Sequence, residues 1–114
     1  MKHTIDATNK SVGRIATEVA HLLQGKNDPA YNPRLTGTNH VEVTNASKVR
    51  VSSPGKYESK KYHWHTGYMG HLRTKTLKSA MEIDPTWVLK NAIYNMLPKN
   101  RLRRDRLLRL TVKA

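Results

Sequence analysis

Cysteine and phenylalanine are absent from this 114-residue chain, and acidic residues are few. Without cysteine the chain can have no disulfide framework, no thiolate nucleophile and no cysteine-ligated metal site. No apolar run approaches the roughly 20 residues that span a bilayer, and residues 1–6 lack the apolar stretch of a signal peptide. We therefore expect neither a secreted nor a membrane-embedded protein, and the length predicts a single domain, residues 1–114.

The scarcity of acids leaves a large excess of positive charge. The chain has 21 lysine and arginine residues against 8 aspartate and glutamate residues, which gives a formal net charge of +13. A chain with this charge repels itself, so its expected partner is a polyanion. The charge rises along the chain, since residues 1–57 hold 8 basic and 4 acidic groups and residues 58–114 hold 13 basic and 4 acidic groups.

The C-terminal segment 99–114 is especially basic, with seven basic groups and Asp105 as its single acid. It follows Pro98, which stops a helix, and it contains leucines that can anchor it. A solvated helix face usually carries both signs of charge, whereas arginine forks pair bidentately with phosphate oxygens. Residues 99–104, at the start of this segment, are therefore predicted to contact phosphate.

Aromatic residues are also few, and four of the seven tyrosines and tryptophans fall between Tyr57 and Tyr68. They are interleaved with lysine and histidine residues. Flat rings among cations suit RNA, whose unpaired bases stack on rings and whose phosphates pair with cations. A strand whose rings pack inward while its cations face water would give the same pattern, so this segment alone leaves both interpretations open.

Apolar spacing and capping residues predict the elements of the first half. A short strand is expected near residues 3–6, followed by a helix with Ser11 as its N-cap and Gly25 as its C-cap. The segment 25–39 is rich in glycine, proline, asparagine and aspartate, which predicts a long loop. Alternating valines then predict strand structure at 41–43 and again at 49–51, with a turn at 45–47 between them.

The second half is predicted to continue this alternation of strand and helix. In chain order we expect a strand over 61–65, a glycine-bearing loop over 66–70, a helical region from Thr76, a helix that starts at Asp84 and stops at Pro98, a short helix capped by Asn100, and a strand over 110–112. This order of elements favours an α/β fold with a partly parallel sheet.

Motifs for small-molecule chemistry are missing. The two Gly-Lys pairs, at Lys26 and Lys56, lack the flanking residues of a phosphate-binding P-loop. The carboxylates are scattered, and the one close pair, Glu82 and Asp84, lies at a predicted helix boundary where capping explains it. We expect no catalytic residue, no bound metal, no cofactor and no small-molecule substrate.

His63, His65 and His71 form the cluster most suited to chemistry. Three imidazoles can bind zinc, and two can serve as acid and base in metal-free RNA cleavage. No carboxylate lies beside them in the sequence to orient a ring, so contact with phosphate or stacking on a base is the simpler interpretation. An RNA-cleaving or metal-binding enzyme is the alternative.

Six segments of the chain, taken together, resemble one family over nearly the whole length. Two of them match its hallmarks: Lys61-Tyr62-His63-Trp64-His65-Thr66-Gly67-Tyr68, and Met96-Leu97-Pro98-Lys99-Asn100-Arg101-Leu102. The other four are residues 5–8, 13–16, 31–33 and 45–49, in the family's order and at its spacing. The chain is similar to the L-thirteen family of large-subunit ribosomal proteins.

The resemblance implies a three-layer α/β/α domain around a mostly parallel four-stranded sheet. It also implies a non-catalytic, cytoplasmic component of the large ribosomal subunit that binds large-subunit rRNA, lies beside other large-subunit ribosomal proteins and takes part in early assembly. Charge and placement within or directly beside the matching segments give the expected RNA-binding residues: Arg14, Lys60, Lys61, His65, Tyr68, Lys99, Asn100, Arg101 and Arg104. A free-standing regulatory RNA-binding module outside the ribosome is a further alternative.

The chain departs from the family pattern at several positions. Asn39 stands where an acidic residue is common, and Met69-Gly70-His71 replaces the usual Pro-Gly-Gly. Members commonly carry a longer N-terminal lead and a C-terminal extension. Contacts made by those extensions are therefore expected to be absent here or supplied by neighbours.

Overall fold

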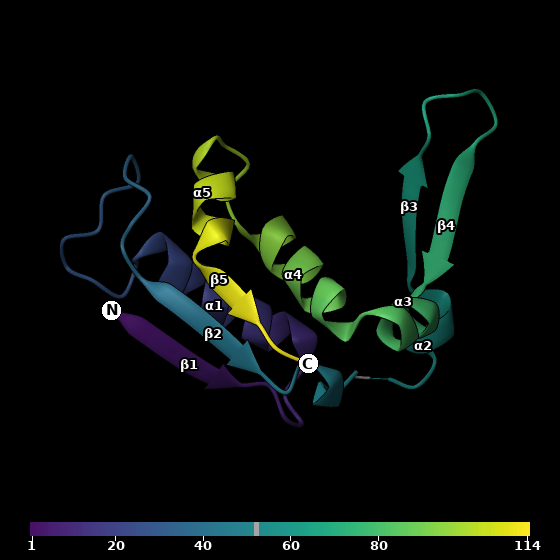
Figure 1. Cartoon of the computed structure of the whole chain (residues 1–114), viewed down its shortest axis with the longest axis horizontal. Coiled ribbons are helices and arrows are strands. Elements are labelled where there is room, and N and C mark those ends of the chain that lie inside the picture. Colours follow the sequence, from purple (N-terminus) through teal and green to yellow (C-terminus); the bar gives the residue numbers. More distant parts are fainter. Residues whose placement is uncertain (52) are drawn as a thin grey trace.

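The structure is a computed structural model that describes residues 1–51 and 53–114. It is a mixed α/β fold with a three-stranded sheet and a separate two-stranded sheet (Figure 1). The elements in chain order are β1 (Lys2–Asp6), α1 (Val12–Gln24), β2 (His40–Thr44), the 3-10 helix η1 (Ala46–Lys48), α2 (Lys56–Ser59), β3 (Lys61–His65), β4 (Leu72–Thr76), α3 (Leu77–Ile83), α4 (Pro85–Met96), α5 (Leu102–Leu108) and β5 (Leu110–Val112). Among the described residues, no helix has the length and apolar character needed to cross a membrane.

The main sheet has the strand order β1-β2-β5, and both pairings are parallel. Its register places Ile5, Val43 and Val112 side by side across the three strands. Ile5 and Val43 are buried in the same cluster as Ile15 of α1 and Ile93 of α4, and Val112 packs against that cluster. The apolar face of the sheet therefore forms one side of the core, and α1 and α4 pack against this face.

The opposite face of the main sheet is polar, and it corrects the expected architecture. Lys2, Thr4, His40 and Thr111 are exposed, and Glu42 lies among them as a half-buried acid. The α/β class is confirmed, but the expected three-layer arrangement around four strands is wrong for the described residues, where three parallel strands carry one helical layer. Because the strand side chains alternate between apolar and polar, the outer face suits solvent better than a second layer of helices.

Helix α1 begins and ends where the sequence predicts. The Ser11 hydroxyl accepts a hydrogen bond from the Arg14 N–H (3.3 Å), and Gly25 takes the left-handed conformation (φ 81°) that closes the helix. Val19 and Leu23 on the inner face are fully buried in the core. The Ser11 cap therefore fixes the first turn of α1, and Arg14 is exposed on that turn.

Helix α4 is also confirmed, together with both of its predicted boundaries. The Asp84 Oδ1 accepts hydrogen bonds from the N–H (3.0 Å) and the hydroxyl (2.6 Å) of Thr86, and these bonds lower the pKa of Asp84. Leu89 and Ile93 bury the inner face, and the helix ends at Met96, two residues before the proline. This helix joins the main sheet to the second, smaller part of the fold.

Strands β3 and β4 form an antiparallel hairpin that projects from the body of the molecule (Figure 1). The strand over 61–65 is confirmed, whereas the strand over 72–76 is not predicted by the sequence. The strand expected at 49–51 is wrong, since only an isolated bridge between Ser11 and Arg50 occurs there. The projecting hairpin explains a radius of gyration of 15.3 Å, compared with about 13 Å for a compact domain of this length.

Candidate nucleic-acid interface

All nine residues expected to bind RNA are exposed, and they occupy three regions. The first region is the first turn of α1, with Arg14; the second is the hairpin and its base, with Lys60, Lys61, His65 and Tyr68; the third is the α4–α5 turn and α5, with Lys99, Asn100, Arg101 and Arg104. Exposure allows contact but does not choose among basic residues. Their hydrogen bonds and ring contacts separate those that hold the fold together from those that face solvent.

Two arginines of the basic C-terminal segment serve the fold. Arg106 is 1% exposed, and its Nη2 donates to the Leu35 carbonyl (3.1 Å). Arg109 donates to the carbonyls of Leu23 (2.9 Å) and Asn39 (2.6 Å), and burial together with nearby Arg106 lowers the pKa of Arg109. Backbone carbonyls therefore engage both guanidinium groups, and both residues lie outside the segment 99–104 that is predicted to contact phosphate.

Two more basic residues of the segment have partners on the surface. The Arg103 guanidinium lies 3.7 Å from the centre of the Tyr94 ring and donates to the Tyr94 hydroxyl (2.5 Å). The Lys113 ammonium pairs with the Glu42 carboxylate (2.5 Å). Three basic residues remain, all exposed and without an ion pair or a side-chain hydrogen bond in the described part of the chain: Lys99, Arg101 and Arg104. We name these three the tail cations, since their charge stays available to a polyanion.

Asn100, which lies between two of the tail cations, has a structural task. Its Oδ1 accepts a hydrogen bond from the Leu102 N–H (3.1 Å) at the start of α5, so the predicted capping contact is confirmed, although Arg101 occupies the cap position itself. With the oxygen engaged, the amide NH₂ remains to donate to a ligand. The capping contact also fixes the turn that carries Lys99 and Arg101.

The hairpin loop presents rings and ring nitrogens to solvent. The His65 Nδ1 accepts a hydrogen bond from the Gly67 N–H (2.9 Å), so Nδ1 is already engaged and Nε2 is the ring nitrogen left for a ligand. Tyr68 is 74% exposed, and its ring meets the His71 ring edge-on with 6.0 Å between ring centres. His65 at the end of β3 and Tyr68 in the loop are therefore both exposed, with groups that can stack on, or donate to, a nucleic acid.

Lys60 lines a groove together with basic residues that the sequence does not single out. The groove has a volume of about 480 Å³ and runs from the first turn of α1, at Gly13, to the base of the hairpin. Arg50 and Lys56 also line it. The fold brings these three cations to one groove. No pattern in the sequence indicates that they lie together.

Arg73 and Lys75 are further exposed or half-buried cations that sequence reasoning missed. They lie on β4, directly opposite Trp64 and Tyr62 of β3. Residues 72–76 have no alternation of apolar and polar side chains, so the sequence holds no strand signal that could have found these two cations. The hairpin therefore carries cations on both of its strands.

The histidine cluster has no metal-binding geometry in the structure. His63 and His65 share one face of β3, while His71 is the last residue of the hairpin loop before β4. The described residues contain no group of three His, Asp or Glu side chains placed to hold a metal ion. The metal-binding alternative therefore finds no such group among the described residues, and the three exposed imidazoles among cations fit contact with a nucleic acid.

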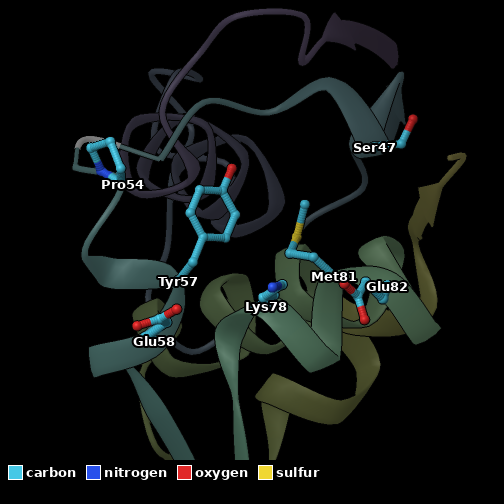
Figure 2. Close-up of a pocket in the computed structure, with 7 residues that line it drawn as sticks. All are labelled: Ser47, Pro54, Tyr57, Glu58, Lys78, Met81 and Glu82. Atoms are coloured by element: carbon cyan, nitrogen blue, oxygen red, sulfur yellow. The ribbon is translucent and has the colours of Figure 1, made fainter.

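Another hollow, of about 490 Å³, has a different electrostatic character (Figure 2). Figure 2 shows Tyr57 and Met81 extending toward it from α2 and α3. Glu58 and Glu82 line it together with Lys78, so both signs of charge are present. This hollow lacks the positive surroundings that the groove beside α1 offers to a phosphate.

Comparison with known proteins matches the chain to one family. The family model described as Ribosomal protein L13 matches residues 1–113. Relatives named large ribosomal subunit protein uL13 include that of Aquifex aeolicus, 45% identical over 95% of this chain and 74% of the relative, and that of Nitratiruptor sp., 46% identical over 96% of this chain and 78% of the relative. The protein of the same name from Clostridioides difficile is 41% identical over 98% of this chain and 78% of its own length. The chain belongs to the Ribosomal protein L13 family.

Proposed function

We propose that this protein is a structural, non-catalytic constituent of the large ribosomal subunit that binds large-subunit rRNA and helps the subunit to assemble early. The names of its relatives support a place in the large ribosomal subunit. RNA binding is supported by the basic C-terminal segment, in which some arginines hold the fold together and other cations face solvent. Arg106 and Arg109 hold α5 and β5 against the body, while the tail cations point to solvent on the same segment. Charges fixed in this way can meet phosphates at set positions, which is the observation that carries the proposal.

The mechanism is electrostatic and geometric. Cations neutralise phosphates and release counterions, and a rigid fold sets the spacing of the phosphates that it contacts. The proposed RNA-binding residues are those of the three regions described above, from Arg14 through the hairpin to the tail cations and Asn100. Because the hairpin projects from the body, the single domain 1–114 can hold separate RNA segments together, which suits a role in assembly. Its proposed place is the cytoplasmic ribosome, beside neighbouring large-subunit proteins.

Sedimentation of a native cell lysate through a sucrose gradient tests this proposal. We expect the protein to co-sediment with the large subunit at about one copy per particle and to stay there after a high-salt wash, because several contact regions act at once. A protein that remains mostly at the top of the gradient would overturn the ribosomal role. It would favour the free-standing RNA-binding module instead.

A further inference from the structure

A further pocket lies between the hairpin and α4, where both tryptophans of the chain line it, and it shares Tyr62 and Asn91 with the groove beside α1. It has a volume of about 330 Å³ and is lined by Tyr62, His63, Trp64, Lys75, Trp87 and Asn91. We name it the tryptophan pocket. Its volume is at the lower end of the range for sites that take small organic ligands.

The register of the hairpin explains which side chains reach this pocket. Side chains alternate between the two faces of a strand, so Tyr62 and Trp64 share one face of β3. Lys75 on β4 lies directly opposite Tyr62 and therefore belongs to the same face. Trp87 and Asn91 are four residues apart on α4, which also places them on one face.

Part of the pocket serves packing, but Trp64 does not. The rings of Tyr62 and Trp87 meet edge-on with 4.9 Å between ring centres, and the Lys75 ammonium lies 4.1 Å from the centre of the Trp87 ring. These contacts seat the hairpin on α4. Trp64 is 49% exposed and has no aromatic partner among the described residues, with the Lys75 ammonium 6.0 Å from its ring centre. A large indole is therefore left partly open to solvent.

The charge of the pocket selects its ligand. No lining residue is acidic, the Lys75 ammonium lies over both indoles, and Arg73 is paired across from Trp64 on β4. A cationic side chain of a partner protein would be repelled, whereas a flat ring attached to an anion is attracted both to the indole and to the ammonium. A nucleotide has both features, and the Asn91 amide can donate to and accept from the edge of a base.

We infer that the tryptophan pocket binds one unpaired nucleotide of the bound RNA, with its base stacked on Trp64 and its phosphate beside Lys75. This inference rests on the proposed function, in which the protein binds RNA. It adds a preference for single-stranded over duplex RNA, which phosphate contacts alone cannot give. A base inside a duplex has both faces covered by its neighbours, so only a single-stranded loop, bulge or end can place a base here. The hairpin therefore distinguishes single-stranded RNA from duplex RNA.

Tryptophan fluorescence of the full chain gives a direct readout. In the variant Trp87→Phe the single tryptophan is Trp64, so its emission reports on the proposed stacking surface. The probes are a single-stranded RNA oligonucleotide and a blunt RNA duplex with the same number of phosphates. We expect the single strand to quench the emission strongly and the duplex to bind with little quenching.

Affinity measurements on Trp64 variants provide a second readout that does not depend on Trp87. Trp64→Ala should lower the affinity for the single strand by about fivefold to a hundredfold, the loss expected for one stacked base, and should leave the duplex affinity unchanged. Trp64→Phe should recover most of the loss because it restores a ring. Tyr94→Leu is the matched control, since the Tyr94 ring lies outside the pocket and is covered by Arg103.

The outcomes separate this inference from the function on which it rests. Equal single-strand affinity for Trp64→Ala and the wild type, or an equal loss for single strand and duplex, would overturn the nucleotide pocket. The proposed function would still stand in that case if Arg101→Ala and Arg104→Ala weaken binding of both probes. If the wild-type chain binds neither probe, the proposed function fails with the pocket.

Discussion

The Arg109 guanidinium lies 2.9 Å from the Leu23 carbonyl oxygen, so the residue just before β5 closes the C-terminal end of α1. The last carbonyls of a helix have no partner inside the helix and need one from elsewhere. The same guanidinium also donates to the carbonyls of Asn39 (2.6 Å) and Thr36 in the loop 25–39. One side chain therefore ties a helix, a long loop and the last strand together.

Arg109→Ala should destabilise the protein by about 3 kcal/mol, because three carbonyls in a partly buried site lose a charged donor. Thermal or urea denaturation followed by circular dichroism measures this loss. Arg104→Ala is the control, since Arg104 is exposed, and its effect should stay within about 0.5 kcal/mol. Equal stability of the two variants would contradict the assignment of Arg109 to the fold.

Gly37→Ala should also destabilise the protein, by about 1–2 kcal/mol. Gly37 has a φ of +83°, and a Cβ added there would lie 3.3 Å from the Leu23 carbonyl oxygen and 3.4 Å from that of Gln24. Gly13→Ala should instead stabilise the protein, by about 0.5–1 kcal/mol. A Cβ at Gly13 meets nothing within 4 Å, and alanine is a better helix former than glycine. Denaturation midpoints of the two variants that move in the same direction would count against this account.

The parts of the fold that the sequence predicts are those governed by local chemistry. Ser11 and Gly25 bound α1 because a hydroxyl cap and a left-handed glycine act within one turn. Val49 and Val51 led to the wrong prediction of a strand, because an alternation of apolar and polar residues indicates which side chains are buried and not whether the backbone pairs with another strand. Val49 is 8% exposed and packs in the core without joining a strand. The polar strand 72–76 has no apolar face to reveal it.

The candidate site could be predicted only in part, for a related reason. Arg104 and Arg106 are two residues apart on α5, so they point to different sides of the helix. Helical spacing could have separated them, but a buried arginine at the inward position goes against the expectation for a charged side chain. Its role depends on the Leu35 carbonyl, which lies 71 positions away in the sequence. Contacts over that separation leave no local pattern.

Acid should remove a stabilising contact at Glu42. Its carboxylate accepts from Lys113 (2.5 Å) and Lys2 (2.9 Å), and these contacts lower the pKa of Glu42 from 4.5 to about 2. A carboxyl whose pKa is lower in the folded state stabilises the fold fully above its unfolded pKa and loses that contribution as pH falls toward its folded pKa. The contribution is therefore present above about pH 4.5 and is lost between about pH 4.5 and pH 2.

Glu42→Gln isolates this contribution from that of other acids. We expect the variant to melt at a lower temperature than the wild type at pH 6, and the difference to shrink as the pH is lowered through the same window. The comparison is made between the two proteins at each pH because the pKa of Asp6, lowered to about 2 by Asn45 and Thr8, adds an acid-sensitive contribution to both. A difference that stays constant with pH would show that the lysine contacts carry no net stabilisation.

Removing two tail cations should change the salt dependence of RNA binding and leave stability alone. Each phosphate contact adds about 0.7 to 0.9 to the slope of log affinity against log salt concentration. Arg101→Ala combined with Arg104→Ala should therefore reduce that slope by roughly 1.4 to 1.8. Both side chains are exposed and lack partners among the described residues, so the melting temperature should not move.

Filter binding to large-subunit rRNA at several salt concentrations measures the slope, and calorimetry measures the melting temperature. Arg34→Ala removes a positive charge from the exposed loop 25–39, outside the three proposed contact regions, and is the control for net charge alone. If charge acts only through the overall field, the double variant will lose about twice what Arg34→Ala loses. If the tail cations contact phosphates, the double variant will show the reduced slope and Arg34→Ala will keep a slope close to that of the wild type, because a contact that was never made releases no counterion.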